Sequence, residues 1–325
     1  MSGEPVLDVR GLTVEYATET GPVVAVDEVD LDVRPGEFVG VVGESGCGKS
    51  TLLFAVAHLL SPPAAITAGS VEFRGANLVT MSDKELSALR WRDLSVVMQS
   101  AMNALNPVTT IGTQFKDTLA AHGNSSRAEI EERSTEVLRL VGIDPVHRDS
   151  YPHQLSGGMR QRAMIAMALL FTPELVIMDE PTSALDVVAQ RSLMVQIKQL
   201  QKRLGFAVLF VTHDMSLVSH FSDRLLVMYA GNVVEIGPTR AVFDAPAHPY
   251  SRGLLDAFPS VRGPRTELTG IPGRPPDLRN PPSGCRFHPR CPVVMPHCSS
   301  DEPDLYSAGA TRSRCLKHAP RAEAS

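Results

Sequence analysis

The chain has 325 residues, 43% hydrophobic and 21% charged, which is enough for one large domain with an appendage or for two domains. A net charge of −5 and a pI of about 6.1 argue against a protein built to bind nucleic-acid phosphates non-specifically. No apolar run approaches the roughly 18–20 residues that cross a bilayer, and the N-terminus carries no secretory signal. We therefore expect a cytoplasmic chain that reaches a membrane only through partners.

Two stretches near the N-terminus alternate apolar and polar residues. They cover residues 6–16 and 23–33, and a period of two predicts half-exposed antiparallel strands with a turn at 20–22. Tyr16 lies at the end of the first stretch, where its ring could stack on adenine. The alternative is a tyrosine that packs on its neighbours at a strand edge.

A phosphate-binding loop follows the next apolar run, residues 38–42, and precedes a helical pattern. The order of strand, glycine loop and helix is the context that this motif requires. Backbone N–H groups would surround the phosphates, Lys49 would reach the β and γ phosphates, and the Ser50 hydroxyl would hold Mg²⁺. The candidate nucleotide-binding residues here are Gly43, Glu44, Ser45, Gly46, Cys47, Gly48, Lys49, Ser50 and Thr51.

Short strands are predicted at residues 69–73 and 94–98, and Gln99 ends the second of them. A glutamine there could ligate Mg²⁺ or orient a water molecule, although an ordinary loop residue is the simpler interpretation. Helical spacing then recurs over three segments, which indicates a helical insertion at about residues 101–171 of an α/β core. The segments are residues 111–121, 127–141 and 157–171.

Ser156 directly precedes the last of these segments and can cap its helix. Gly157 and Gly158 leave backbone N–H groups accessible, so a second anion site at a helix N-terminus is possible. A plain helix cap is the alternative.

An apolar strand at residues 175–178 ends in Asp179 and Glu180. Beside a phosphate loop, Asp179 would support the Mg²⁺ shell and Glu180 would polarise the attacking water. A long helix at residues 187–204 and another buried strand at 206–211 follow. His213 lies two residues after the end of that strand, where it could touch a γ-phosphate.

These motifs, in this order, resemble the ATP-binding subunit of an ABC transporter. The resemblance identifies Walker A at residues 43–50, the glutamine loop at Gln99, the signature at 155–161, Walker B ending at Asp179 and Glu180, a D-loop at 183–186 that includes Asp186, and the switch histidine His213. It implies an α/β P-loop ATPase core with an N-terminal antiparallel β-subdomain and a helical subdomain. It also implies that Lys49, Gln99, Glu180 and His213 serve catalysis.

The resemblance also implies partners. Two such domains would pair head to tail, as a homodimer or with a similar second ATPase, so that Ser156, Gly157 and Gly158 serve the partner's nucleotide. Gln99 and the insertion near residues 103–115 would contact one of two membrane permease subunits. The chain would lie peripherally on the cytoplasmic face of the cell membrane, with a solute-binding protein as an indirect partner.

The C-terminal stretch at residues 247–255, 271–273 and 284–292 is similar to the extension of oligopeptide/dipeptide and nickel importer ATPases. We therefore expect an ATP-binding domain at residues 1–245 and an extension at 246–325. The expected function is ATP-driven import of short peptides. Nickel or oligosaccharide import is the nearest alternative, and nucleic-acid maintenance or translation is a more distant one that the charge and the single Walker A disfavour.

Four cysteines fall in this extension, and four thiolates suit one metal site. The cysteine ligands of structural zinc sites usually lie in closer pairs along the sequence, whereas the spacing of [4Fe–4S] ligands varies more. The importer ATPases that this extension resembles, where they have this cysteine pattern, look like cluster binders. We expect an iron–sulfur cluster, with zinc or plain reduced thiols as alternatives. Cys47 is not expected to be a ligand, because it belongs to the phosphate loop. The expected ligands are Cys285, Cys291, Cys298 and Cys315, and His288, His297 and His318 are spare candidates.

Overall fold

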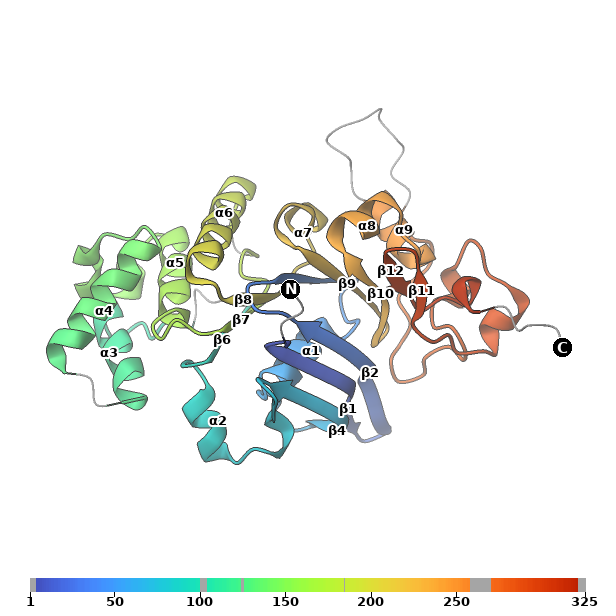
Figure 1. Cartoon of the computed structure of the whole chain (residues 1–325), viewed down its shortest axis with the longest axis horizontal. Helices are drawn as coiled ribbons and strands as arrows, with labels where there is room; N and C mark the ends of the chain where they lie inside the picture. The colour runs from blue at the N-terminus through green and yellow to red at the C-terminus, as the bar shows by residue number, and fades with distance from the viewer. Residues whose placement is uncertain (1–3, 100–103, 124–125, 184, 258–269, 321–325) are drawn as a thin grey trace. The chain divides into compact units, whose positions relative to one another are not determined.

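The structure is a computed structural model that describes residues 4–99, 104–123, 126–183, 185–257 and 270–320 (Figure 1). The chain divides into two compact units, each built from segments far apart in the sequence. The first unit comprises Met1–Leu7, Val33–Phe38 and Phe73–Phe210, and the second comprises Asp8–Asp32, Val39–Glu72 and Val211–Ser325.

Three neighbouring strands of the first unit lie in the order β8-β7-β6. They are β6 (Leu94–Val97), β7 (Leu175–Asp179) and β8 (Ala207–Val211). β6 and β7 are parallel, with Leu94 opposite Leu175. Every residue of β7 and β8 is buried, which is why both read in the sequence as unbroken apolar runs.

Helices α3, α4 and α5 of the first unit gather into the expected helical insertion (Figure 1). Phe115 of α3 is fully buried, and α4 begins with a capping box between Ser126 and Glu129. The helices of this unit are α2 (Asp83–Leu89), α3 (Ile111–Ala121), α4 (Arg127–Leu140), α5 (Gly157–Ala168) and α6 (Val187–Leu204), with short 3₁₀ segments at Leu78–Thr80, Pro145–Asp149 and Pro152–Gln154 and a two-residue strand β5 (Ala76–Asn77).

The N-terminal part of the second unit holds the predicted alternating strands. β1 (Leu7–Thr18), β2 (Gly21–Val33) and β4 (Ala64–Phe73) lie in the order β2-β1-β4. Apolar side chains on one face, such as Val9, Leu12 and Val14, are fully buried, while their neighbours remain partly exposed. This alternation is the period of two seen in the sequence.

A second sheet in this unit runs in the order β11-β12-β10-β9-β3. β3 is parallel to β9, with Val39 opposite Arg224, whereas β10 pairs antiparallel with β9 on one side and with β12 on the other. The strands are β3 (Phe38–Val42), β9 (Arg224–Tyr229), β10 (Asn232–Pro238), β11 (Tyr306–Ala308) and β12 (Thr311–Ser313), and the helices are α1 (Lys49–Val56), α7 (Met215–Phe221), α8 (Thr239–Asp244) and α9 (Pro249–Asp256).

A buried carboxylate connects β10 with segments later in the chain. Glu235 is fully buried and accepts hydrogen bonds from the N–H groups of Ala247 and His248, at 2.8 and 2.9 Å, and from the Thr311 hydroxyl at 3.2 Å. His248 in turn caps α9, because its Nδ1 accepts from the Tyr250 N–H at 3.0 Å. Burial lowers the pKa of His248 to about 3, so this ring stays neutral near pH 7.

Several predicted elements agree with the structure, and the differences are instructive. The predicted helix at residues 187–204 is confirmed as α6, whereas the segments predicted to reach residues 141 and 171 end at Leu140 and Ala168. β4 begins at Ala64, five residues before the predicted strand. The sequence analysis missed α2 and the paired strands β11 and β12, which are three residues each.

Candidate nucleotide-binding and hydrolysis site

The phosphate loop lies in the second unit, between β3 and α1, as predicted. Two of its glycines, Gly43 and Gly48, are required by close approach of other backbone segments. Gly48 has a φ of 104°, and a Cβ there would lie 2.2 Å from the carbonyl oxygen of Ala25. A Cβ at Gly43 would lie 2.2 Å from the Met228 carbonyl oxygen. Neither position accepts a side chain without movement of the backbone.

Lys49 is buried inside this loop, with 7% of its surface exposed. Its Nζ donates to the carbonyl oxygens of Gly43, at 2.8 Å, and Glu44, at 2.9 Å. The ammonium group is therefore held by the loop's own backbone, at the point where the motif places phosphate oxygens. Burial raises the pKa of the neighbouring Cys47 thiol, against the opposing effect of Lys49, so this cysteine remains a neutral packing residue.

The other predicted residues of this unit lie as follows. The Tyr16 hydroxyl is 3.1 Å from Oγ1 of Thr51, which places the tyrosine beside the first turn of α1. Ser50 is the second residue of that helix. His213 is exposed, two residues after the end of β8, and Asp214 next to it caps α7.

The carboxylate pair lies in the first unit, at the end of β7. Asp179 is its last residue and is 2% exposed, and Glu180 follows with a φ of 44°. A positive φ is costly for a glutamate and occurs mostly where surrounding contacts impose it. The structure brings Gln99 to this point, because its Nε2 donates to Oε2 of Glu180 at 3.1 Å.

The signature segment is tied to the same turn. Ser156 caps α5 by accepting from the Met159 N–H, as predicted, and a Cβ at Gly158 would meet nothing within 4 Å. Buried Gln161 donates to the carbonyl oxygen of Pro181, directly after Glu180. No sequence signal predicted this contact. It makes the orientation of α5 and that of the Glu180 turn depend on each other.

The residues after Glu180 lead into α6, which has a capping side chain at its start. Asp186 caps α6, accepting from the Ala189 N–H at 2.9 Å. Two residues in the predicted contact regions, Asn103 and Ala184, lie outside the described part of the chain.

The four C-terminal cysteines line one cavity of about 30 Å³, together with His288. Burial raises the pKa of Cys285 to about 11 and also raises the pKa values of Cys291 and Cys315. Among the described residues, however, no group of three or more His, Cys, Asp and Glu side chains is arranged to hold a metal ion. The structure thus gathers the predicted ligands without giving them the geometry of a formed site.

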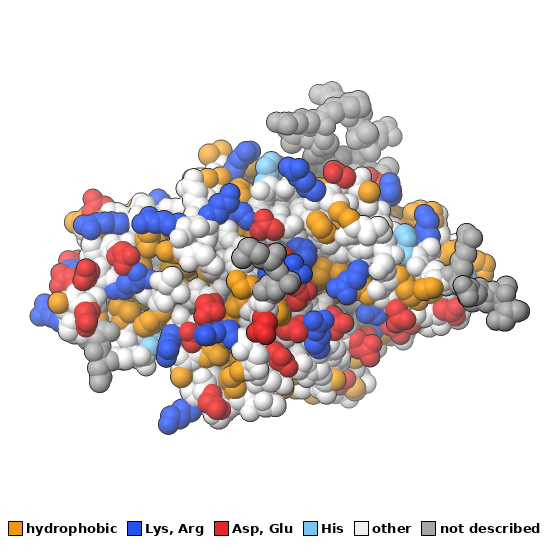
Figure 2. Space-filling model, viewed as in Figure 1, with side chains coloured by type: hydrophobic (Ala, Val, Ile, Leu, Met, Phe, Trp, Pro, Cys, Tyr) orange, Lys and Arg blue, Asp and Glu red, His pale blue; other side chains and the backbone are white. Residues whose placement is uncertain are grey.

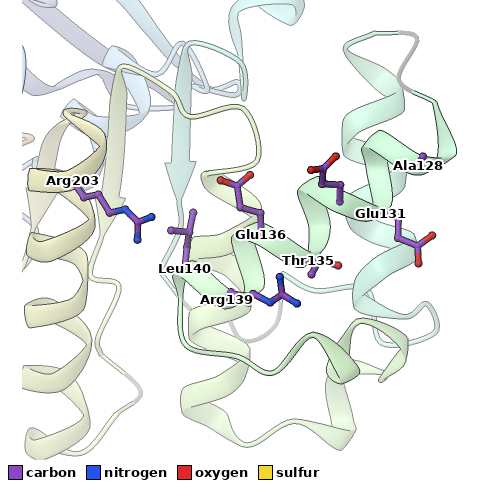
Figure 3. A pocket seen from close by; sticks show the side chains of 8 residues that line it. Ala128, Glu131, Thr135, Glu136, Arg139, Leu140 and Arg203 are labelled. Atoms are coloured by element: carbon purple, nitrogen blue, oxygen red, sulfur yellow. The ribbon is translucent and has the colours of Figure 1, made fainter.

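A larger hollow, of about 700 Å³, lies elsewhere in the first unit, along α4 (Figure 3). Two of its carboxylates already have cationic partners, because Glu131 pairs with Arg148 at 2.8 Å and Glu136 with Arg133 at 2.6 Å. None of the predicted site residues lines it. We assign it no role in nucleotide binding.

The surface agrees with the inference from net charge. On the face shown in Figure 2, acidic and basic side chains are interspersed among the described residues. Within the described part of the chain, none of the helices combines the length and the apolar character that a membrane span requires.

A strand that runs into a glycine loop, with a buried lysine held at the start of the following helix, defines a P-loop nucleotide-binding protein. Comparison with known proteins makes the family specific. The family model described as ABC transporter matches residues 26–183, and the one described as oligopeptide/dipeptide transporter, C-terminal region, matches residues 234–298.

Curated relatives match almost the whole chain. The dipeptide transport ATP-binding protein DppD of Caldanaerobacter subterraneus subsp. tengcongensis is 42% identical, over 92% of each chain. The oligopeptide transport ATP-binding protein OppD of Salmonella typhimurium is also 42% identical, over 96% of this chain and 93% of the relative. The chain therefore belongs to the ABC transporter family, whose ATP-binding subunits hydrolyse ATP.

Solved structures agree with this assignment. The dimeric structure of MJ0796, a bacterial ABC transporter cassette, aligns with a TM-score of 0.64 and 30% identity, over 72% of this chain and 99% of that one. CbiO1 from Clostridium perfringens, part of the transporter complex cbiONQ, aligns with a TM-score of 0.65 and 27% identity, over 75% of this chain and 92% of that one. The predicted α/β P-loop class is confirmed.

Proposed function

We propose that this chain is the ATP-hydrolysing subunit of an importer for short peptides and acts through separate permease subunits. The observation that carries the proposal is the pairing of an ATP-binding core with a C-terminal region of the oligopeptide/dipeptide type, in a chain 42% identical to dipeptide and oligopeptide transport proteins. Nickel or oligosaccharide import would use the same chemistry in this chain, and the named relatives favour peptides. Nucleic-acid maintenance and translation have no such support.

The proposed chemistry uses each predicted residue in one role. Residues 43–51 surround the phosphates of ATP, Lys49 neutralises charge between the β and γ phosphates, and Tyr16 stacks on adenine. Ser50, Gln99 and Asp179 are oxygen donors, the kind of ligand that Mg²⁺ takes beside phosphates. Glu180 polarises the attacking water and His213 contacts the γ-phosphate.

A dimer completes the proposed machinery. Ser156, Gly157 and Gly158 of one chain would present N–H groups to the nucleotide bound by the partner's phosphate loop, and Asp186 would lie near that interface. The second ATPase is a copy of this chain or a similar one. In the proposed assembly the dimer lies on the cytoplasmic face of the membrane, against two permeases, and a solute-binding protein delivers the peptide. Residues 1–245 form the ATP-binding domain and residues 246–325 the extension.

The isolated chain is therefore expected to be a weak ATPase. Coexpression with its permeases, its partner ATPase and its solute-binding protein should raise the rate, and addition of short peptides should raise it further. ATP turnover measured in the assembled complex, with peptide, Ni²⁺ or oligosaccharide added in turn, tests both statements. Full peptide-responsive activity of the monomer would contradict the partner requirement, and stimulation by Ni²⁺ or oligosaccharide alone would replace the proposed substrate.

For the four cysteines we propose a metal site that stabilises the extension, a [4Fe–4S] cluster in preference to zinc. What supports it is the convergence of Cys285, Cys291, Cys298 and Cys315 on one cavity. Thiolates are the ligands that iron–sulfur clusters require, and a bound metal would offset the burial that raises the pKa values of Cys285, Cys291 and Cys315. The role of the cluster would be structural, because ATP hydrolysis involves no electron transfer. Its binding would contribute to the folding free energy of the extension.

Protein purified without oxygen is expected to be brown and to contain about four irons per chain. Cys291→Ser should lose the colour and loosen the extension while the core still binds ATP. Cys47→Ser is the matched control, since it removes a thiol outside the cavity and should keep the iron. Metal analysis that finds one zinc per chain and no iron would reject the cluster.

A further inference from the structure

One side chain from the cysteine-bearing segment reaches the phosphate loop. Arg290 lies in a 3₁₀ segment, His288–Arg290, directly before Cys291. Its Nη1 donates to Oε2 of Glu44 at 2.7 Å, and its Nη2 donates to Oε1 at 3.0 Å. The Arg290 side chain is 6% exposed and that of Glu44 is 24% exposed. This is a bidentate, largely buried ion pair between residues 246 positions apart.

The guanidinium is fixed on its other sides as well. Its Nε donates to the Pro272 carbonyl at 2.8 Å, its Nη1 lies 3.3 Å from the Tyr229 hydroxyl, and its Cζ lies 5.7 Å from the centre of the Tyr229 ring. These contacts hold the guanidinium in place independently of Glu44. The carboxylate is held at a point set by the extension and by β9.

The backbone of Glu44 is held from the same region. Its N–H donates to the hydroxyl of Tyr250 at 2.8 Å, and Tyr250 in α9 is fully buried. The carbonyl oxygen of Glu44 accepts from Lys49 at 2.9 Å. The N–H, the carbonyl and the carboxylate of one loop residue thus each have a defined partner, and two of these partners come from beyond residue 245.

The charge of Glu44 needs explanation. A carboxylate in a loop that binds a triphosphate repels its ligand, and in a partly buried site water screens this repulsion poorly. The Arg290 guanidinium cancels that charge. Glu44 beside it raises the pKa of Arg290 further above its ordinary value, so the guanidinium stays charged.

We propose that Arg290 is a positioning residue for ATP, which neutralises Glu44 and fixes its place in the phosphate loop, so that nucleotide affinity depends on the cysteine-bearing segment. The inference rests on the proposed function, since it takes residues 43–51 as the ATP site. It assigns the C-terminal extension a direct effect on the loop, through a residue outside the nucleotide-binding motifs.

The test is the dissociation constant of Mg-ATP for the full-length protein. Arg290→Met should raise it by at least about fivefold, within the range of measured coupling between sites, and the loss should shrink as salt is added. The double variant Glu44→Gln/Arg290→Met should recover most of the affinity, because the unneutralised carboxylate is gone. Glu44→Gln alone should weaken ATP binding by less than about fivefold, because it removes the carboxylate together with the ion pair.

Arg286→Met is the matched control. Arg286 also joins the cysteine-bearing segment to the rest of the second unit, through an ion pair with Asp27 and a hydrogen bond to the Ala230 carbonyl at 2.6 Å. If Arg290 acted only by attaching the extension, both variants would lower affinity alike and the double variant would not recover, which would overturn the proposal.

Two further outcomes separate this inference from the function on which it rests. An unchanged dissociation constant in folded Arg290→Met protein, with ATP binding still lost in Lys49→Ala, would overturn the role of Arg290 and leave the ATP site standing. If Arg290→Met fails to fold, the ATP affinity of Glu44→Gln tests the proposal instead. A fivefold weaker ATP affinity of Glu44→Gln would contradict the argument that the Glu44 charge must be neutralised. Normal ATP binding by Lys49→Ala would instead refute the proposed site itself.

Discussion

Glu180→Gln is expected to bind ATP normally and to hydrolyse it at least about 100-fold more slowly, the scale associated with loss of a positioned acid–base group. The substitution keeps the shape of the side chain and its contact with Gln99, whose Nε2 lies 3.1 Å from Oε2 of Glu180. An amide, however, cannot polarise water as a carboxylate does. Phosphate release by the assembled transporter measures the rate, and nucleotide titration measures the binding.

Glu174→Gln provides the control for this experiment. Glu174 precedes the other end of β7, where its exposed carboxylate pairs with Arg74 at 3.1 Å. The same chemical change there should leave the rate within about twofold, since exposed ion pairs contribute little. A wild-type rate in the Glu180→Gln complex would show that another group activates the water.

Lys49→Ala is expected to abolish measurable ATP binding, with at least about a 100-fold rise in the dissociation constant. The buried ammonium group makes two hydrogen bonds to loop carbonyls, and in the proposed site it neutralises phosphate charge. Charge-assisted hydrogen bonds contribute about 1.5–3 kcal/mol each, and each 1.4 kcal/mol is tenfold in affinity. Titration with Mg-ATP of protein shown to be folded by circular dichroism provides the measurement.

Lys198→Ala removes a second lysine as a control. Lys198 lies in α6 of the first unit, with Nζ 5.0 Å from the centre of the Phe38 ring. It should cost some stability and leave the dissociation constant unchanged, within about twofold, because a cation–π contact contributes only about 0.5–2 kcal/mol. An equal loss of affinity in both lysine variants would argue against a specific role for Lys49.

Elements determined by local sequence were predicted well. α3 and α6 have capping side chains, Thr110 and Asp186, and apolar periodicity along their length, so nearby residues contain enough information to place both ends. β11 and β12 have three residues each and little pattern of their own. β12 pairs with β10, which is distant in the sequence, and β11 pairs with β12, so the position of both strands depends on a non-local interaction that no window of sequence reports.

The candidate site divides in the same way. The glycines and Lys49 were found because phosphate binding demands a fixed local spacing. The contacts of Gln161 and Arg290 were not predicted, because each is made with a residue distant in the sequence, and a glutamine or an arginine has many uses on a protein surface. Residues of this kind are recognised in the structure by their burial, which is unusual for polar side chains. Gln161 is only 3% exposed and Arg290 only 8%.

The buried Glu235 has a consequence for the order of folding during synthesis. A ribosome must add 76 residues after Glu235 before Thr311, one of its hydrogen-bond donors, exists. Until then β10 lacks β12, so the nascent sheet has an open edge next to an incompletely bonded carboxylate. Unpaired edges and buried charges without partners are both unfavourable. The unit that holds the phosphate loop therefore completes its fold only late in translation, when β12 has emerged.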